Sequence, residues 1–275
     1  MEKLKKYKEL IILVVAVLCA VIAIAYIMLD PEAEEPQGES GSVIATYDVS
    51  EAGDKSIIAT VYKDGLLDIV GSGRMRDLSN IPWIDHANVI TKAQISNGIT
   101  NIGRYAFYHL GALSQITIPS SVTEIGEYAF NGCGVQELVL PEGLTVIGQF
   151  AFEKSFIKSI KLPSTLTEMG LRAFQNCSAL TSVEIADGVT KIGDYAFYGC
   201  KKLENIKIPA SVTYIGKGAF SGCTEIKTVE FVNTADWKLY AKISDSTGEP
   251  VILMFETENA VMLTSSKSDY YWRKG

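Results

Sequence analysis

The chain has 275 residues, a formal net charge of −7 at pH 7, and a hydrophobic content of 47%. This length allows a substantial core in one or two domains. An acidic chain whose basic cluster lies in its first residues has no electrostatic footprint for nucleic acid. Its two histidines, His86 and His109, are too few for a histidine-rich metal site and weaken any mechanism that needs a histidine base.

Residues 1–29 combine a basic cluster with an apolar run. Four lysines lie within the first eight residues, and no charge interrupts the 20 residues from Leu10 to Leu29. About 20 apolar residues in a helix span the hydrocarbon core of a bilayer, and flanking lysines stay in the cytoplasm. We therefore predict a single-pass membrane protein with a cytoplasmic N-terminus, a transmembrane helix, and the rest of the chain outside the cell.

The same run admits a second interpretation, a secretory signal cleaved at the small-x-small site Ala23–Ala25, which would leave a secreted protein. Signal cores of about 7–15 residues are shorter than this run, which favours the retained anchor. Both interpretations export residues 42–275. Residues 30–41 contain two prolines, two glycines and four glutamates, and we predict an acidic flexible linker there.

Residues 42–88 are predicted to form a small β-rich cap before a repeat region. The pair Asp64–Gly65 stands between two apolar alternating runs, which is a strong hairpin signal. We expect this hairpin and Trp83 to cover the first coil of the repeats, because a stack of coils exposes an apolar face at each end.

Residues 89–231 repeat with a period of 22 or 23 residues. Each unit contains Ile-Gly or Met-Gly, and Ala-Phe begins three residues beyond the glycine. The pairs begin at Ile102, Ile125, Ile147, Met169, Ile192 and Ile215. We expect the recurring glycines to turn the coil, because glycine tolerates positive φ.

Each unit then enters a short segment in which apolar and polar residues alternate, such as Leu180–Ile185. This alternation predicts a short strand with one buried face. Proline ends four of these segments, where it removes a backbone donor. Since one coil cannot bury its apolar side alone, the coils are predicted to stack into a solenoid with a parallel β-sheet on one face.

Charged residues at the middle strand position test this alignment. Lys161, Glu184, Lys207 and Glu230 alternate in sign from one unit to the next. Opposite charges on adjacent strands are favourable. We interpret this ladder as structural, because a self-neutralising column is a poor site for a strongly charged ligand.

The repeat unit resembles the BspA-like, or treponemal-type, leucine-rich repeat, with its pattern I-G-x-x-A-F-x-x-C-x-x-L-x-x-V-x-I-P. The resemblance extends from Val89 to about Phe231, with Leu110 and Ser155 in place of the cysteine. It implies a leucine-rich-repeat solenoid with a parallel β-sheet on one face, small β-rich caps at both ends, and a bacterial cell-surface role in adhesion or protein interaction. It implies no catalytic residues.

The resemblance also bears on the C-terminal residues 232–275. Trp237 and Tyr270–Trp272 are similar to the segment that often closes such repeats, so a C-terminal cap is expected. Tyr240 and Ile252–Phe255 are further candidates to cover the last coil.

Four of the five cysteines, Cys133, Cys177, Cys200 and Cys223, lie three residues after the phenylalanine of their own unit. They are predicted to form one column whose parallel Cβ vectors do not favour a disulfide. Buried cysteine behaves as a small hydrophobe, so we expect buried free thiols and no metal site.

Two surfaces are candidates for binding. The first consists of polar strand positions in successive units: Ser114, Gln115, Gln136, Glu137, Lys158, Thr181, Glu204 and Lys227. The second is an aromatic column of Tyr105, Tyr128, Phe150 and Tyr195, which Arg172 and Gly218 are expected to interrupt. Its rings either bind sugar or protein or stack on each other and cover the coil edge, and we favour the stack.

These features predict a membrane-anchored extracellular protein that binds an unknown protein or a host surface component. The alternative is a passive surface scaffold or spacer whose contacts lie in residues 232–275. The sequence contains no Walker loop, Rossmann glycine pattern, H-E-x-x-H motif or EF-hand loop, so we predict no enzyme, no cofactor and no small-molecule substrate.

Overall fold

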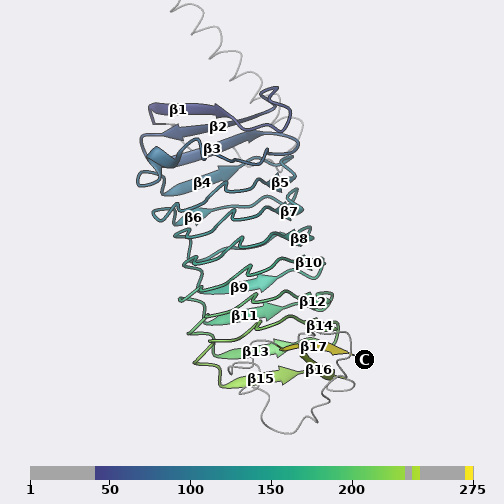
Figure 1. Cartoon of the computed structure of the whole chain (residues 1–275). Coiled ribbons are helices and arrows are strands. Elements are labelled where there is room, and N and C mark those ends of the chain that lie inside the picture. Colours follow the sequence, from purple (N-terminus) through teal and green to yellow (C-terminus); the bar gives the residue numbers. More distant parts are fainter. Residues whose placement is uncertain (1–40, 233–236, 242–269, 275) are drawn as a thin grey trace, which may run out of the picture. The chain divides into compact units, whose positions relative to one another are not determined.

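The computed structural model describes residues 41–232, 237–241 and 270–274 (Figure 1). The predicted transmembrane helix, the linker before Gly41 and the segment Ile252–Phe255 lie outside the described residues. Within the described ranges, no helix is long and apolar enough to cross a bilayer. The repeats form a β-solenoid of about seven turns with parallel sheets.

Three antiparallel strands precede the first coil: β1 (Val43–Asp48), β2 (Ile57–Tyr62) and β3 (Leu66–Gly71). The hairpin predicted at Asp64–Gly65 is therefore confirmed. Strand β3 also pairs in parallel with β4 (Lys92–Ile95), so one sheet continues from the N-terminal strands into the first coil. Trp83 is fully buried, and its ring meets Tyr47 edge-on at 6.1 Å.

The predicted parallel sheet runs along one side of the coils. Its strands after β4 are β6 (Gln115–Ile116), β9 (Ser159–Leu162), β11 (Ser182–Ile185), β13 (Asn205–Ile208) and β15 (Thr228–Phe231). In β9, β11 and β13, exposed and buried residues alternate, as the sequence pattern predicts. Pairing is in register, with Lys161 beside Glu184 and Lys207 beside Glu230.

This sheet is interrupted in the third coil, where the prediction of a strand at Val135–Leu140 is wrong. On this side of the coils, strand pairing between this coil and the next one is limited to one isolated bridge, between Glu137 and Ser159. No backbone hydrogen bond links residues 136–141 to residues 113–119 of the coil before, all of which the structure describes. The break coincides with the first 22-residue unit, where Gly134 lies directly against the carbonyl of Gly111.

A second parallel ladder, which we did not predict, runs through the residues just before each repeat glycine. Its two-residue strands pair in two groups. The first contains β5 (Asn101–Ile102), β7 (Glu124–Ile125), β8 (Val146–Ile147) and β10 (Glu168–Met169), and the second contains β12 (Lys191–Ile192) and β14 (Tyr214–Ile215). Two residues are too few to show alternation, so the sequence carries no period-2 signal for them.

Threonine side chains reinforce this second ladder. The hydroxyl of Thr123 donates to the carbonyl of Thr100 at 3.2 Å, and Thr145 donates to Thr123 at 3.0 Å. Thr167 repeats the bond to Thr145 at 3.1 Å. The recurring threonine therefore satisfies a carbonyl of the preceding coil.

The described C-terminal strands attach to the end of the second ladder. Strand β17 (Tyr270–Lys274) pairs antiparallel with β14, and β16 (Trp237–Ala241) pairs antiparallel with β17. The C-terminal chain thus adds antiparallel strands at the last turn of the second ladder.

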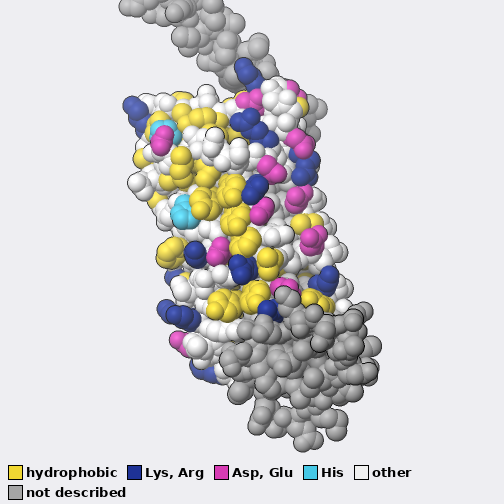
Figure 2. All heavy atoms as spheres, in the orientation of Figure 1, with side chains coloured by type: hydrophobic (Ala, Val, Ile, Leu, Met, Phe, Trp, Pro, Cys, Tyr) yellow, Lys and Arg dark blue, Asp and Glu magenta, His cyan; other side chains and the backbone are white. Residues whose placement is uncertain are grey.

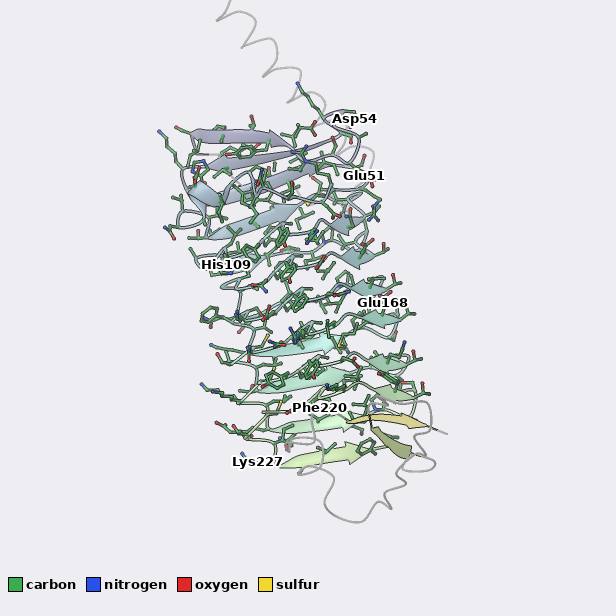
Figure 3. The ribbon with its side chains drawn as sticks, viewed as in Figure 1. Glu51, Asp54, His109, Glu168, Phe220 and Lys227 are labelled. Carbon is green, nitrogen blue, oxygen red and sulfur yellow. The ribbon has the colours of Figure 1, made fainter. Side chains whose placement is uncertain are left out.

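The core contains a continuous column of phenylalanine rings. Phe107, Phe130, Phe152, Phe174, Phe197 and Phe220 are each at most 1% exposed. Neighbouring rings stack with centroids 4.9–5.5 Å apart. Figure 3 shows Phe220 among the lowest coils, with Lys227 and His109 toward one edge of the coils and Glu168 toward the other.

The four cysteines form a buried column of free thiols beside the rings, as predicted. The thiol of Cys177 donates to the carbonyl of Phe152 at 3.0 Å, and Cys200 and Cys223 repeat this bond to Phe174 and Phe197. Burial raises the pKa of the Cys133 thiol to about 12, so this thiol stays protonated at neutral pH.

The prediction that the Ile-Gly glycines adopt positive φ is wrong. Those glycines are absent from the positive-φ residues, and their role is close approach. A Cβ on Gly126 would lie 2.8 Å from the backbone nitrogen of Arg104 in the preceding coil. Positive φ falls two residues later, with values of 54–60° at non-glycine residues: Tyr105, Tyr128, Phe150, Arg172 and Tyr195.

Candidate functional site

The eight polar residues predicted on the sheet lie at the surface, and we call them the sheet strip. Gln115 lies in β6 and Glu137 forms the isolated bridge, whereas each of the other six lies directly before a strand or the bridge. Seven of them are exposed and Glu204 is half-buried. Backbone hydrogen bonds align them across coils: Lys158 donates to Gln136 at 2.9 Å, Thr181 to Lys158 at 2.8 Å, and Lys227 to Glu204 at 2.7 Å. Ser114 and Gln115 belong to the strip but lie across the break in the sheet.

Ion pairs neutralise the C-terminal half of this face. Lys161 lies 3.2 Å from Glu184, and Lys207 lies 3.4 Å from Glu230, which confirms two pairs of the predicted ladder. Lys227 and Glu204, both in the sheet strip, pair at 3.0 Å. Such exposed pairs contribute about 0–1 kcal/mol each to stability, so they shape the surface charge more than they hold the fold.

Sequence reasoning missed an exposed apolar residue on this face. Val139 is 84% exposed and follows the strip residue Glu137 by two positions. Its signal was present in the sequence, since it is the only apolar residue at the middle strand position.

The aromatic column forms a second strip, on the part of the coil that follows the repeat glycines. Tyr105 and Tyr128 stack with centroids 5.1 Å apart, and Tyr128 and Phe150 stack at 4.7 Å with planes within 2°. The favoured prediction of a ring stack is confirmed. Because each ring is covered by its neighbour, the inner ring faces are unavailable to a sugar.

The prediction that Arg172 interrupts this column is wrong. Its guanidinium lies over the ring of Phe150 at 5.7 Å and over the ring of Tyr195 at 5.4 Å. Arginine attracts aromatic faces through the ring quadrupole, so Arg172 continues the column where a ring is missing. Gly218 does interrupt it, and Lys217 instead places its ammonium 5.6 Å from the centre of the Tyr195 ring. We call Tyr105, Tyr128, Phe150, Arg172 and Tyr195 the aromatic strip.

Figure 2 shows a band of hydrophobic side chains, with single basic side chains among them, descending the displayed face of the repeats.

Polar side chains next to the aromatic strip form closed networks. Glu153 accepts hydrogen bonds from Asn131 at 2.9 Å and from Gln175 at 3.3 Å. Arg104 pairs with Glu127 at 3.3 Å and donates to the hydroxyl of Tyr105 at 3.2 Å.

A shallow hollow lies beside the second ladder, lined by Asp77, Arg104, Glu124, Glu127, Gln149 and Glu168. Arg74 pairs with Glu124 at 3.0 Å, so two of its four carboxylates already have a cationic partner. No group of three or more metal-ligating side chains occurs in the part of the chain that the structure describes.

These features define a leucine-rich-repeat solenoid: stacked coils of 22 or 23 residues, a parallel sheet with polar outward positions, and a core of phenylalanine and cysteine columns. The chain belongs to the BspA type leucine-rich repeat family. Six copies of that repeat match it over residues 86–203 and 145–241, which together cover more than half of the chain.

Solved structures share this fold. The T. pallidum leucine-rich repeat protein is 24% identical, with 63% of this chain and 89% of that chain covered at a TM-score of 0.52. A leucine-rich repeat protein from Bacteroides ovatus is 21% identical, with 69% of this chain and 57% of that chain covered at a TM-score of 0.50. The chain also resembles a leucine-rich repeat protein from Eubacterium ventriosum, which is 26% identical. That match covers 70% of this chain and 73% of that chain at a TM-score of 0.41. No curated protein matches the sequence.

Proposed function

We propose that this chain is a membrane-anchored extracellular protein that binds another protein through the sheet strip. One contrast carries the proposal. Inner columns repeat one residue, with alanine and phenylalanine in all six Ala-Phe units, because each must fit the same space. The strip changes chemical type from coil to coil, from Ser114 to Gln136, Lys158, Thr181 and Glu204. A specific interface needs such non-repeating chemistry, whereas a purely structural face does not.

The dimensions of the strip suit a protein partner. Rungs of a β-sheet lie about 4.8 Å apart, so the five steps from Ser114 to Lys227 extend roughly 24 Å. A typical protein interface buries about 800 Å² on each partner. The strip and the side chains around it are long enough to supply such an area, and solenoids commonly bind partners on extended faces. Leucine-rich-repeat proteins are generally non-enzymatic binding scaffolds, which agrees with this role.

Two sequence features support the proposed location. The uninterrupted apolar run from Leu10 to Leu29 follows a lysine cluster, which favours a retained anchor with the repeats outside the cell. The acidic residues that follow suit a spacer between membrane and repeats. A cleaved signal would export the same repeats as a secreted protein.

The test uses the full chain in lipid nanodiscs and a triple variant of the strip, Gln136→Lys, Lys158→Glu and Thr181→Lys. A control triple variant, Ser120→Lys, Ser178→Lys and Lys201→Glu, makes the same kinds of change at exposed positions outside the strip. Proteins that crosslink to the parent protein are identified and purified. Each is then titrated against the parent, the strip variant and the control variant. We expect at least one partner whose Kd rises more than tenfold with the strip variant and less than twofold with the control.

Two results would reject the proposal. If deletion of residues 232–275 abolishes binding while the strip variant binds like the parent, the alternative scaffold with C-terminal contacts is correct. If no purified protein binds the parent with a Kd below about 100 μM, neither interpretation holds.

A further inference from the structure

We infer that Arg172, held between the rings of Phe150 and Tyr195, is a preformed recognition point for a carboxylate side chain of a protein partner. The inference rests on the proposed function only in taking the ligand to be a protein. It concerns the aromatic strip, which lies on a different part of the coil from the sheet strip.

The position of the Arg172 side chain is fixed by its backbone and by both rings. Arg172 has φ of 56°, and its backbone N–H donates to the carbonyl of Asp194 in the next coil at 2.9 Å. Its guanidinium lies over Phe150 from the preceding coil and Tyr195 from the following coil. Because rings flank the guanidinium on both sides, the remaining approach for a ligand is along its solvent-facing edge.

The charge of Arg172 is uncompensated within the described residues. No hydrogen bond or ion pair to its side chain is present there, and its Nε is a buried donor with no acceptor. The Nε of Arg104, on the same face, also lacks a hydrogen-bond acceptor, but Arg104 differs because Glu127 pairs with it at 3.3 Å and because it donates to the Tyr105 hydroxyl.

The nearby carboxylates are already engaged by other donors. Glu153 accepts from Asn131 and Gln175, and Lys154 lies 3.9 Å from it. One oxygen of Asp194 accepts from the Tyr214 hydroxyl at 3.1 Å and from the Lys217 backbone N–H at 3.0 Å. The residues that the structure describes therefore leave Arg172 without a counter-ion, although the net charge of the chain is −7.

The chemistry of the site favours a single carboxylate. Guanidinium N–H groups form a rigid fork that matches a carboxylate in a bidentate way. A phosphate dianion is disfavoured because the carboxylates of Glu153 and Asp194, on the coils before and after Arg172, would repel it. Tyr198, 37% exposed and edge-on to Tyr195 at 5.8 Å, supplies an apolar contact beside the fork.

A protein fits this surface better than a polysaccharide. Sugars stack on open aromatic faces, and here the faces of Tyr128 and Phe150 are covered by neighbouring residues of the strip. Arginine and tyrosine are the residue types that dominate binding energy at protein interfaces. A glutamate or aspartate at the edge of an apolar protein surface satisfies both the fork and the rings.

The test follows the Nε–Hε signals of the five arginines by NMR in the ¹⁵N-arginine-labelled full chain. The probe is acetyl-alanyl-glutamyl-alanine amide, with the glutaminyl peptide as neutral control and glucuronate as the carbohydrate carboxylate. We expect the glutamyl peptide to shift the Arg172 signal saturably, with a Kd on the order of 10 mM, while the Arg104 signal moves at least fivefold less. Tyr195→Leu removes one ring and keeps the arginine, and it should weaken binding at least fivefold.

Several results would overturn the inference: no shift at Arg172, equal shifts with the glutamyl and glutaminyl peptides, or an unchanged Kd in Tyr195→Leu. Tighter binding of glucuronate than of the peptide would assign the site to an acidic sugar instead. These outcomes do not depend on the sheet strip, so failure here leaves the proposed function standing. Failure of the strip variants equally leaves this site intact.

Discussion

At the scale of single residues, each coil places two structural requirements at different positions. The two requirements are close approach between backbones and a positive φ, which one glycine often meets together. Close approach of backbones falls on the Ile-Gly glycines, whereas positive φ falls two residues later, on a residue with a full side chain in every coil except that of Gly218. A non-glycine residue in the left-handed region costs about 1–2 kcal/mol. In the aromatic strip, this cost is offset by stacking between coils, because the backbone conformation brings the side chains into register.

The distinction predicts different outcomes for two Gly→Ala substitutions. Gly170 has no positive φ, yet a Cβ there would lie 2.5 Å from the backbone nitrogen of Gln149. Gly170→Ala should therefore destabilise by about 1–3 kcal/mol through forced backbone displacement. A Cβ on Gly111 would meet nothing within 4 Å, so Gly111→Ala should change stability by less than about 0.5 kcal/mol. Urea unfolding followed by circular dichroism measures both, and equal midpoints would disprove the close-approach explanation.

At the scale of elements, the first turn of the solenoid shows how the ladders end. Asn101 stands in β5 at the position that Glu124 and Val146 occupy in the next two strands. Its buried amide accepts from the Met75 N–H at 2.7 Å and donates to the Met75 carbonyl at 3.0 Å, as a neighbouring strand would. The indole N–H of Trp83 donates to the carbonyl of Ala106 at 3.1 Å in the same way. Side chains therefore satisfy backbone groups that lack a coil above them.

Asn101→Val tests this terminating role. Valine is the native residue at the equivalent position 146, so the backbone tolerates it, but both Met75 groups would lose their partner. We expect a loss of about 2–4 kcal/mol, because each buried backbone group left unpaired costs about 1–3 kcal/mol. The matched change Glu124→Val removes only the exposed ion pair with Arg74 and should cost at most about 1 kcal/mol. Similar urea midpoints for the two variants would contradict the role of Asn101.

The same elements show what the sequence could and could not predict. The long strands, the phenylalanine column and the cysteine column were predictable, because burial repeats with the unit and alternates along the strand. The two-residue ladder was not, because its pairing depends on backbone contacts between coils and leaves no pattern within one coil. Arg172 was misinterpreted for a related reason. The sequence shows only that position 172 is not aromatic, while the cation–π contacts that replace the ring form between coils. The role of Asn101 was missed because it depends on the place of this residue in the first strand of the second ladder.

At the scale of the whole molecule, the repeat region is a one-dimensional stack. Each coil contacts its neighbours, so stability is approximately a sum of coil terms and nearest-neighbour terms. The phenylalanine column contributes to the nearest-neighbour terms, since every inner ring packs against one ring above it and one below. A surface carried by such a stack is rigid along its length, which suits a binding strip that spans several coils.

This architecture predicts that coupling between core substitutions depends on coil separation. Each of Phe107→Leu, Phe130→Leu, Phe152→Leu and Phe197→Leu should cost about 1–2 kcal/mol through lost contacts and a small cavity. Phe130 and Phe152 stack at 5.1 Å, so their double variant should deviate from additivity by about 0.5–1 kcal/mol. Phe107 and Phe197 share no neighbouring ring, and their double variant should be additive within about 0.5 kcal/mol. Urea unfolding of all six variants beside the parent gives both coupling energies. Equal coupling in the near and distant pairs would mean that the coils do not communicate through adjacent rings, and a binding strip would then lack the rigid support that the stack provides.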